Sequence, residues 1–173
     1  MGALDLPNVE PIAVDATTEC HITPALVASR MAEYLDIPAG RILEPSAGTG
    51  ALVAALLEKG HPAEQIVAIE RHSSLKSALL RRLEGEPVEI ICGDFLEYAK
   101  GARVNFSGVL MNPPFRKVRQ HVDAALSLLY SGGALVALVP DTFQHDAAEE
   151  IETLPNDIFA LAKVRTKIVR INR

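Results

Sequence analysis

The chain has 173 residues, 49% of them hydrophobic, which suffices for one compact core and leaves no room for a second sizeable domain. No apolar stretch approaches the length of a membrane span, and the first residues lack the basic-then-apolar order of a signal peptide, so no membrane association is expected. The two cysteines form no disulfide or zinc pattern and the net charge is −5, which predicts a cytoplasmic protein without a uniformly basic surface.

Apolar periodicity predicts strands and helices that alternate along the chain. Residues 1–20 contain prolines and acids and are predicted to form a loosely ordered arm, followed by a single domain over 21–173. Helices are expected at 23–35, 50–59, 73–84, 95–100, 117–130 and 142–153, and strands at 41–44, 66–70, 87–92, 106–111 and 133–139, with two more within 157–171. This alternation predicts a mostly parallel sheet with right-handed crossovers, closed by an antiparallel hairpin because the last two strands are too close for a helical connection.

The first predicted helix begins at Thr23-Pro24. Threonine is a good N-cap residue and proline fits the first helical position. Apolar residues then recur at helical spacing as far as Leu35. Helix starts of this kind are common, so the segment by itself indicates no function.

A glycine-rich run, Glu44-Pro45-Ser46-Ala47-Gly48-Thr49-Gly50, lies between a short apolar strand and a helix. Gly48 and Gly50 allow the backbone to approach a ligand closely, and Glu44 suits a cationic part of that ligand. The spacing is not the dinucleotide pattern G-x-G-x-x-G, and no lysine comes after it as in a phosphate-binding loop. A nicotinamide-type turn or a plain tight turn stays open as an alternative.

Two acids stand at the ends of the next two predicted strands. Glu70 ends its strand about twenty residues beyond the glycines, where a carboxylate can accept hydrogen bonds from both hydroxyls of a ribose. Asp94 comes after Gly93 and can accept from an amine such as that of adenine, while Phe95 can flank the ring. The alternatives are a solvated strand end for Glu70, a helix N-cap for Asp94 and a core position for Phe95.

Asn112-Pro113-Pro114-Phe115 comes directly after a buried strand, at the edge where open α/β sheets bind ligands. The nitrogen of an exocyclic amine is a poor nucleophile because its lone pair is delocalised. The side-chain oxygen of Asn112 and the carbonyl of Pro113, aimed by the prolines, can accept its two hydrogens and direct the lone pair at a methyl donor. Phe115 can stack on a planar acceptor. A simple turn between strand and helix is the alternative interpretation.

Together, and about sixty residues apart, the two motifs resemble those of S-adenosylmethionine-dependent amino-methyltransferases. The preceding Thr-Pro helix makes the resemblance closest to the gamma-type DNA N6-adenine methyltransferases, in which a similar segment covers the cofactor. The resemblance implies an α/β, Rossmann-like class I methyltransferase fold with a seven-stranded sheet. It implies S-adenosylmethionine as cofactor and a catalytic role for residues 112–115. The cofactor-binding residues that it implies are Thr23, Glu44, Ser46, Gly48, Gly50, Glu70, Asp94 and Phe95.

The expected acceptor is adenine N6 in DNA, flipped out or single-stranded. Three basic residues beside the motif, Arg116, Lys117 and Arg119, are candidates for phosphate contact. RNA bases and a protein glutamine carry the same planar nitrogen and stay open, as does a non-catalytic, cofactor-binding partner subunit. No separate target-recognition domain is predicted, so a recognition partner or a homo-oligomer stays open as well. The five histidines lack ligand spacing, and no metal site is expected.

Overall fold

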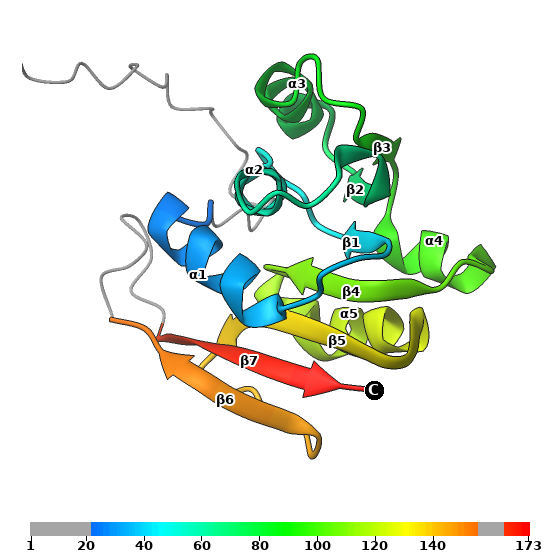
Figure 1. Ribbon diagram of the computed structural model, residues 1–173. Helices are drawn as coiled ribbons and strands as arrows, with labels where there is room; N and C mark the ends of the chain where they lie inside the picture. The colour runs from blue at the N-terminus through cyan, green and yellow to red at the C-terminus, as the bar shows by residue number, and fades with distance from the viewer. Residues whose placement is uncertain (1–21, 156–164) are drawn as a thin grey trace, which may run out of the picture.

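The structure is a computed structural model that describes residues 22–155 and 165–173, so the predicted arm, residues 1–20, lies outside the described residues. The described chain builds a seven-stranded sheet in the order β3-β2-β1-β4-β5-β7-β6 (Figure 1). The strands are β1 (Ile42–Glu44), β2 (Ile66–Glu70), β3 (Glu89–Cys92), β4 (Phe106–Met111), β5 (Leu129–Pro140), β6 (Ala148–Thr153) and β7 (Thr166–Asn172). The helices are α1 (Ala25–Leu35), α2 (Ala51–Glu58), α3 (Ser73–Arg82), α4 (Phe95–Gly101) and α5 (Val118–Ser127), with short 3-10 turns η2 (Ala63–Gln65) and η3 (Phe115–Lys117).

The sheet has the mostly parallel arrangement predicted from the alternation of strands and helices. β1 pairs in parallel with both β2 and β4, and the parallel pairing extends outward to β3 and β5. β7 is antiparallel to both of its neighbours, β5 and β6. The predicted α/β, Rossmann-like fold with a seven-stranded, mostly parallel sheet is confirmed. The strand order reverses between β1 and β4, and open sheets of this kind bind ligands beyond the carboxyl ends of the strands at that point.

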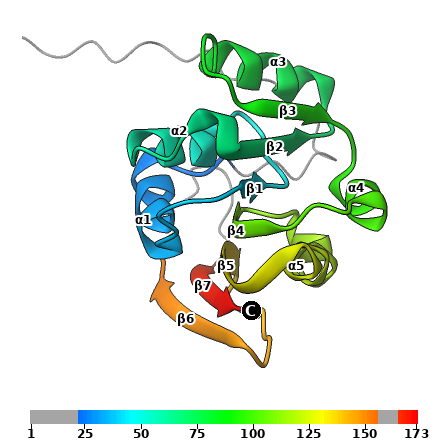
Figure 2. The same cartoon turned by 45° about the vertical axis from the view of Figure 1, so that its right-hand side comes forward.

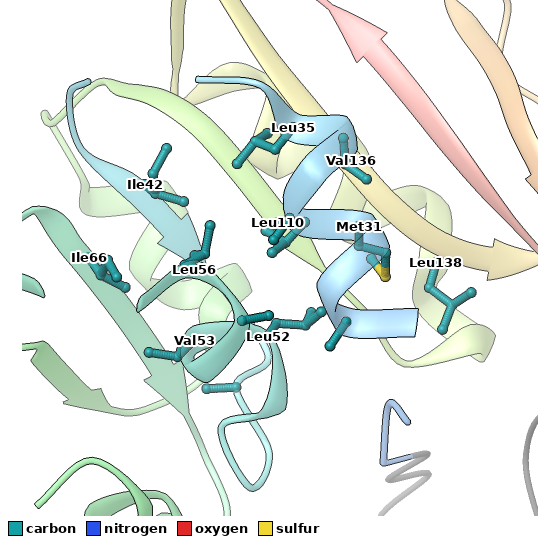
Figure 3. Close-up of a cluster of buried hydrophobic side chains, with 14 of the residues drawn as sticks. Met31, Leu35, Ile42, Leu52, Val53, Leu56, Ile66, Leu110, Val136 and Leu138 are labelled. Atoms are coloured by element: carbon teal, nitrogen blue, oxygen red, sulfur yellow. The ribbon is translucent and has the colours of Figure 1, made fainter. Parts of the chain in front are cut away.

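Helices cover both faces of the sheet. α1, α2 and α3 lie on one face and α4 and α5 on the other (Figure 2). Successive strand residues alternate between the two cores, so Ile42 packs under α1 and α2 while Leu43 packs towards α5. On the first face, Met31 and Leu35 of α1 meet residues of α2 and the central strands (Figure 3). These two packed layers hold the strand ends, and the loops attached to them, in fixed positions.

The start of α1 differs from the prediction. The helix begins at Ala25 with Pro24 at its N-cap, and no side chain caps it. Thr23, predicted as the N-cap, lies before the helix and is buried, with its hydroxyl group bonded elsewhere. Pro24 still helps to start the helix because its fixed φ is compatible with the first turn.

The predicted helix at 142–153 is wrong. Residues 148–153 form β6, the edge strand of the sheet, paired with β7. The chain covers the distance from the end of β5 to the start of β6 in a crossover, residues 141–147, that has a turn at each end, with Phe143 buried against the α5 face. The residues between the two turns, 143–145, belong to no helix or strand, so the connection is made without a helix.

The pairing at the carboxyl end also differs in part. Of the two strands expected within 157–171, β7 is one, whereas residues 156–164 lie outside the described residues. The partner that β7 finds on its outer side is β6, from a segment predicted to be helical. β5 begins at Leu129, within the predicted helix 117–130, and meets β4 through an irregular register beside Phe106.

Candidate active site

The candidate site is a cavity beyond the carboxyl ends of β1, β2, β3 and β4. Each of these strands leads into a loop that contributes to its wall. Most of the predicted site residues lie together there: Thr23, Ser46, Gly48, Glu70, Asp94, Phe95, Asn112 and Pro114 line the cavity. Four other predicted residues do not line the cavity, although each is next in sequence to a residue that does: Glu44, Gly50, Pro113 and Phe115.

The glycine-rich loop is tied to β2. The Ala47 amide donates to the Ile69 carbonyl over 2.9 Å, and the Gly48 amide donates to Oε2 of Glu70 over 2.7 Å. Gly48 has a φ of 54° and Gly50 a φ of 85°, the left-handed region that residues with a Cβ rarely adopt. A Cβ on Gly50 would also come within 2.7 Å of Leu79. The two glycines therefore serve different ends: Gly48 forms the cavity wall, and Gly50 allows α2 to start against α3.

Glu70 is a buried acid at the end of β2, with 5% of its surface exposed. Its two oxygens accept one hydrogen bond each, from the Gly48 amide and from the His72 amide, both over 2.7 Å. A carboxylate oxygen has more than one acceptor site, so each can take a further hydrogen bond from a ligand in the cavity. The backbone donors fix the carboxylate in one orientation, and the alternative of a solvated strand end is thereby wrong.

Glu44 is buried more deeply, with 1% of its surface exposed. One oxygen accepts from the Ser46 amide over 3.0 Å, whereas Oε2 has no hydrogen-bond partner among the described residues. Burial raises the pKa of the Glu44 carboxyl well above its usual range, and the nearby negative charge of Glu70 acts in the same direction. The unpaired oxygen belongs to the side chain that accepts from the lining residue Ser46, so it is suited to a cationic ligand group, reached directly or through a water.

Asp94 and Phe95 lie where β3 passes into α4. Asp94 is the N-cap of α4, and its Oδ1 accepts from the Leu96 amide over 2.8 Å. Its Oδ2 lies 3.7 Å from Nη1 of Arg71. The capping alternative is therefore correct, and it leaves Asp94 on the cavity wall. Phe95 is buried in the core below α5, so it lines the cavity while also packing as a core residue.

The Asn-Pro-Pro-Phe segment leaves β4 at the centre of the sheet. Nδ2 of Asn112 donates a hydrogen bond to Oγ1 of Thr23 over 3.0 Å, which joins the start of α1 to the end of β4. Pro113 is buried and Pro114 lines the cavity, so the chain is held on both sides of the peptide after Asn112. Phe115 is half-buried in η3, outside the cavity wall.

Sequence reasoning missed His121, which lies on the buried face of α5 and lines the same cavity. Its ring centroid is 5.7 Å from that of Phe95, and its Nδ1 is 3.1 Å from the Lys117 carbonyl. Burial lowers the pKa of the His121 imidazole, which favours the neutral form with Nδ1 donating to that carbonyl. The spacing of His121, Val122 and Ala125 on one helical face could have revealed that it points inward. His72, Arg71 and Ile22 are further lining residues that the motifs did not identify.

The predicted phosphate contacts lie outside the cavity. Arg116, Lys117 and Arg119 are located at η3 and the start of α5, away from its wall. Arg119 lies 5.9 Å from the ring centroid of Phe143 and donates to the Gln144 carbonyl, so it holds the crossover against α5. Lys117 instead lines a shallow groove between α4 and α5, next to Asp94.

Within residues 22–155 and 165–173, no cluster of histidine, cysteine or acidic residues could hold a metal ion. The same part of the chain contains no helix that is long and apolar enough to cross a membrane.

The fold occurs in several solved methyltransferases. TrmN from Thermus thermophilus superposes with a TM-score of 0.68 at 14% identity, over 86% of this chain and 48% of TrmN. The 23S rRNA methyltransferase ErmE gives 0.68 at 22% identity, over 84% of this chain and 66% of ErmE. An rRNA methylase from Streptococcus thermophilus gives 0.62 at 13% identity, over 89% of this chain and 99% of that protein. The chain thus spans about half of TrmN and about two thirds of ErmE.

The sequence itself matches the methyltransferase small domain family over residues 13–158. The match covers most of the chain, including the glycine-rich loop and Asn112. The glycine wall of the cavity and the oriented Glu70 carboxylate fit S-adenosylmethionine, and the unpaired Glu44 oxygen is buried outside that wall. The protein belongs to the methyltransferase small domain family, which implies S-adenosylmethionine as its cofactor, and it has the class I methyltransferase fold.

Proposed function

We propose that this protein methylates the exocyclic amine of a nucleic-acid base, with adenine N6 in DNA as the first candidate. The observation that carries the proposal is the position of Asn112, on the cavity wall and bonded through its amide nitrogen to Thr23. In that arrangement the amide oxygen lies on the opposite side of the group and is suited to accept a hydrogen from an incoming amine. Phe115 is proposed to supply a stacking surface near the entrance.

The remaining site residues are proposed to hold the cofactor. Glu70 accepts from the ribose hydroxyls, and Asp94 accepts from the adenine amine while Phe95 packs below the ring. Gly48, Gly50 and Ser46 shape the loop around the methionine part, and the unpaired oxygen of Glu44 takes the ammonium group directly or through a water. When bound, the cofactor supplies an electrophilic methyl group on a positively charged sulfur. The protein contributes alignment and the hydrogen bonds that free the lone pair of the acceptor amine.

RNA is a second candidate acceptor, because ErmE and the Streptococcus thermophilus protein are named as rRNA methyltransferases and share this fold. In either nucleic acid the base must be single-stranded or flipped out to reach a recessed site. We further propose that residues 21–173 act as one catalytic domain without a separate target-recognition domain, and that a partner or a second copy contributes recognition where it is needed. Arg116, Lys117 and Arg119 are proposed to meet the phosphates.

The test uses S-adenosylmethionine with a radiolabelled methyl group and separate pools of DNA, RNA and protein. The proposal predicts label in a nucleic-acid pool with the purified protein and none with Asn112→Ala. Label confined to the protein pool would point to a glutamine side chain and overturn it. No label in any pool, from a protein that binds the cofactor, would favour a non-catalytic partner subunit.

A further inference from the structure

We propose that Thr23 is a positioning residue that sets the orientation of the Asn112 amide, and that it is not primarily a cofactor ligand. Two roles are predicted for Thr23 from sequence, the N-cap of the first helix and a cofactor contact. The structure removes the first role, because Pro24 is the N-cap of α1 and no side chain caps that helix. The Thr23 hydroxyl group instead accepts a hydrogen bond from Nδ2 of Asn112, 89 residues further along the chain, over 3.0 Å.

The orientation of this amide matters for the proposed function, on which the inference rests. A side-chain amide carries a donor nitrogen and an acceptor oxygen on one planar group. Half a turn about the Cβ–Cγ bond of asparagine exchanges the positions of these two atoms. Only the orientation with the oxygen towards the acceptor amine is productive. In the opposite orientation the NH2 group of the Asn112 amide faces the NH2 group of the acceptor, and the hydrogens of both groups lack acceptors. A hydroxyl group that accepts from Nδ2 holds the amide in the productive orientation.

The hydroxyl group is itself held by a fixed element. Thr23 has 6% of its surface exposed and lies just before α1, whose residues Val27 and Met31 are completely buried. Further along the helix, Tyr34 donates to Glu152 of β6 over 2.8 Å, and Arg30 forms an ion pair with the same carboxylate. Arg170 of β7 donates to the Tyr34 carbonyl over 2.6 Å. The position of the Thr23 hydroxyl is therefore set by a helix that is anchored to the antiparallel edge of the sheet.

Three variants test the inference. Thr23→Val keeps the shape of the side chain but cannot accept a hydrogen bond, and Thr23→Ser restores the hydroxyl. We expect Thr23→Val to lower kcat roughly 10- to 100-fold, the rate equivalent of losing one buried hydrogen bond. We expect the dissociation constant for S-adenosylmethionine, measured by calorimetry, to change less than about twofold. Thr23→Ser should recover most of kcat. A merely structural or cofactor-binding role predicts instead a loss of cofactor affinity or of thermal stability.

The third variant, Asn112→Asp, provides a background that makes the test specific to orientation. Both oxygens of a carboxylate are acceptors, so Asn112→Asp has no unproductive orientation to exclude. The loss caused by Thr23→Val should therefore be several-fold smaller when Asn112 is replaced by Asp than in the parent. If Asn112→Asp is inactive, the decision rests on the comparison of Thr23→Val with Thr23→Ser.

The two proposals fail in different ways. If the parent protein transfers no methyl group to a base amine, the proposed function is wrong. If the parent is active but Thr23→Val matches its kcat, or loses cofactor affinity instead, the positioning role is overturned while the function stands.

Discussion

Glu44 holds a carboxyl group that is almost fully buried, with one oxygen bonded to the Ser46 amide and the other without a partner among the described residues. Burial raises the pKa of this carboxyl well above its usual range. A folded pKa above the unfolded value means that the folded protein holds a proton that the unfolded chain releases. The resulting stabilisation is complete below the unfolded pKa, near 4.5, and is lost as the pH rises through the folded pKa.

Glu44→Gln removes this pH dependence. The glutamine oxygen can still accept from the Ser46 amide, and the side chain never ionises. We expect the melting temperature of the variant, relative to the parent, to rise steadily as the pH is raised above about 5. We also expect weaker binding of S-adenosylmethionine, because the amide of the variant cannot ionise to become the counter-charge of the bound cationic group. Thermal unfolding across a pH series, with calorimetry at one pH, measures both. A difference in melting temperature that stays constant with pH would show that Glu44 is ionised throughout.

Glu70 offers a second prediction for a single residue. Glu70→Ala removes the proposed acceptor for two ribose hydroxyls and should raise the dissociation constant for S-adenosylmethionine at least tenfold, equivalent to about 1.5–3 kcal/mol. Glu70→Gln keeps one acceptor oxygen and should lose less. Both variants also disturb the bonds to the Gly48 and His72 amides, so the melting temperature is measured in parallel. A folded Glu70→Ala protein that binds as tightly as the parent would remove this residue from the cofactor site.

At the scale of the element, Glu152 is the contact through which the edge strand β6 holds α1. Its carboxylate receives the Tyr34 hydroxyl and pairs with Arg30, and the hydrogen bond to Glu152 raises the pKa of Tyr34. We expect Glu152→Ala to lower the free energy of unfolding by about 1–2 kcal/mol, since the cluster is only partly buried. Glu149→Ala, an exposed site on the same strand, is the matched control and should change it by less than about 0.5 kcal/mol. Urea unfolding of the two variants tests this; equal effects would mean that the contact to α1 contributes nothing.

The strand β6 is also the element that was predicted wrongly from the sequence. The units of strand, loop and helix up to α5 could be predicted because the buried strands are largely apolar and a glycine or proline follows β1, β3 and β4. β6 is an exposed edge strand in which Glu149, Glu150 and Glu152 interrupt the apolar pattern, and glutamate favours helices in isolation. Its pairing with β7 is a tertiary effect that outweighs this local preference.

For the site, the sequence predicted where many of the residues lie but not the contacts between them. Motifs located the acids and glycines at strand ends, since chain order alone places those ends along one edge of a parallel sheet. They could not indicate which atoms meet. The bond between Thr23 and Asn112 joins residues 89 positions apart, and the burial of Glu44 depends on the packing of the whole loop. His121 was missed because a lone histidine on a helix carries no motif.

At the scale of the whole molecule, the described surface offers little with which to read a base sequence. The basic residues beside the Asn-Pro-Pro-Phe segment are few, and Arg119 is engaged with the crossover. Within residues 22–155 the connections between elements are short, whereas reading several base pairs requires several side chains held in a groove. We therefore predict that this chain alone methylates adenine with little or very short sequence context. Mapping modified adenines in a random DNA library tests it; a defined site of four or more base pairs would contradict it.

Binding should also be weak and sensitive to salt. On a single strand, two or three phosphate contacts give a slope of about −1.4 to −2.1 for the logarithm of affinity against the logarithm of salt concentration. Lys117→Ala should make that slope shallower by about 0.7, whereas Arg81→Ala, exposed on α3 across the sheet, should leave it unchanged. Fluorescence anisotropy with a labelled single-stranded oligonucleotide measures the slope. Equal slopes for both variants would place the phosphate contacts elsewhere.

The identity of the methylated atom tests the proposed chemistry most directly. Nucleic acid treated with the protein and S-adenosylmethionine is digested to nucleosides, and the products are separated and identified by mass spectrometry against standards. The proposed chemistry predicts N6-methyladenine nucleoside with the parent protein and none with Asn112→Ala, while calorimetry shows that this variant still binds S-adenosylmethionine with nearly unchanged affinity. Methylation at a ring carbon or a ribose hydroxyl, or undiminished product from Asn112→Ala, would contradict the assignment of Asn112 to the acceptor amine.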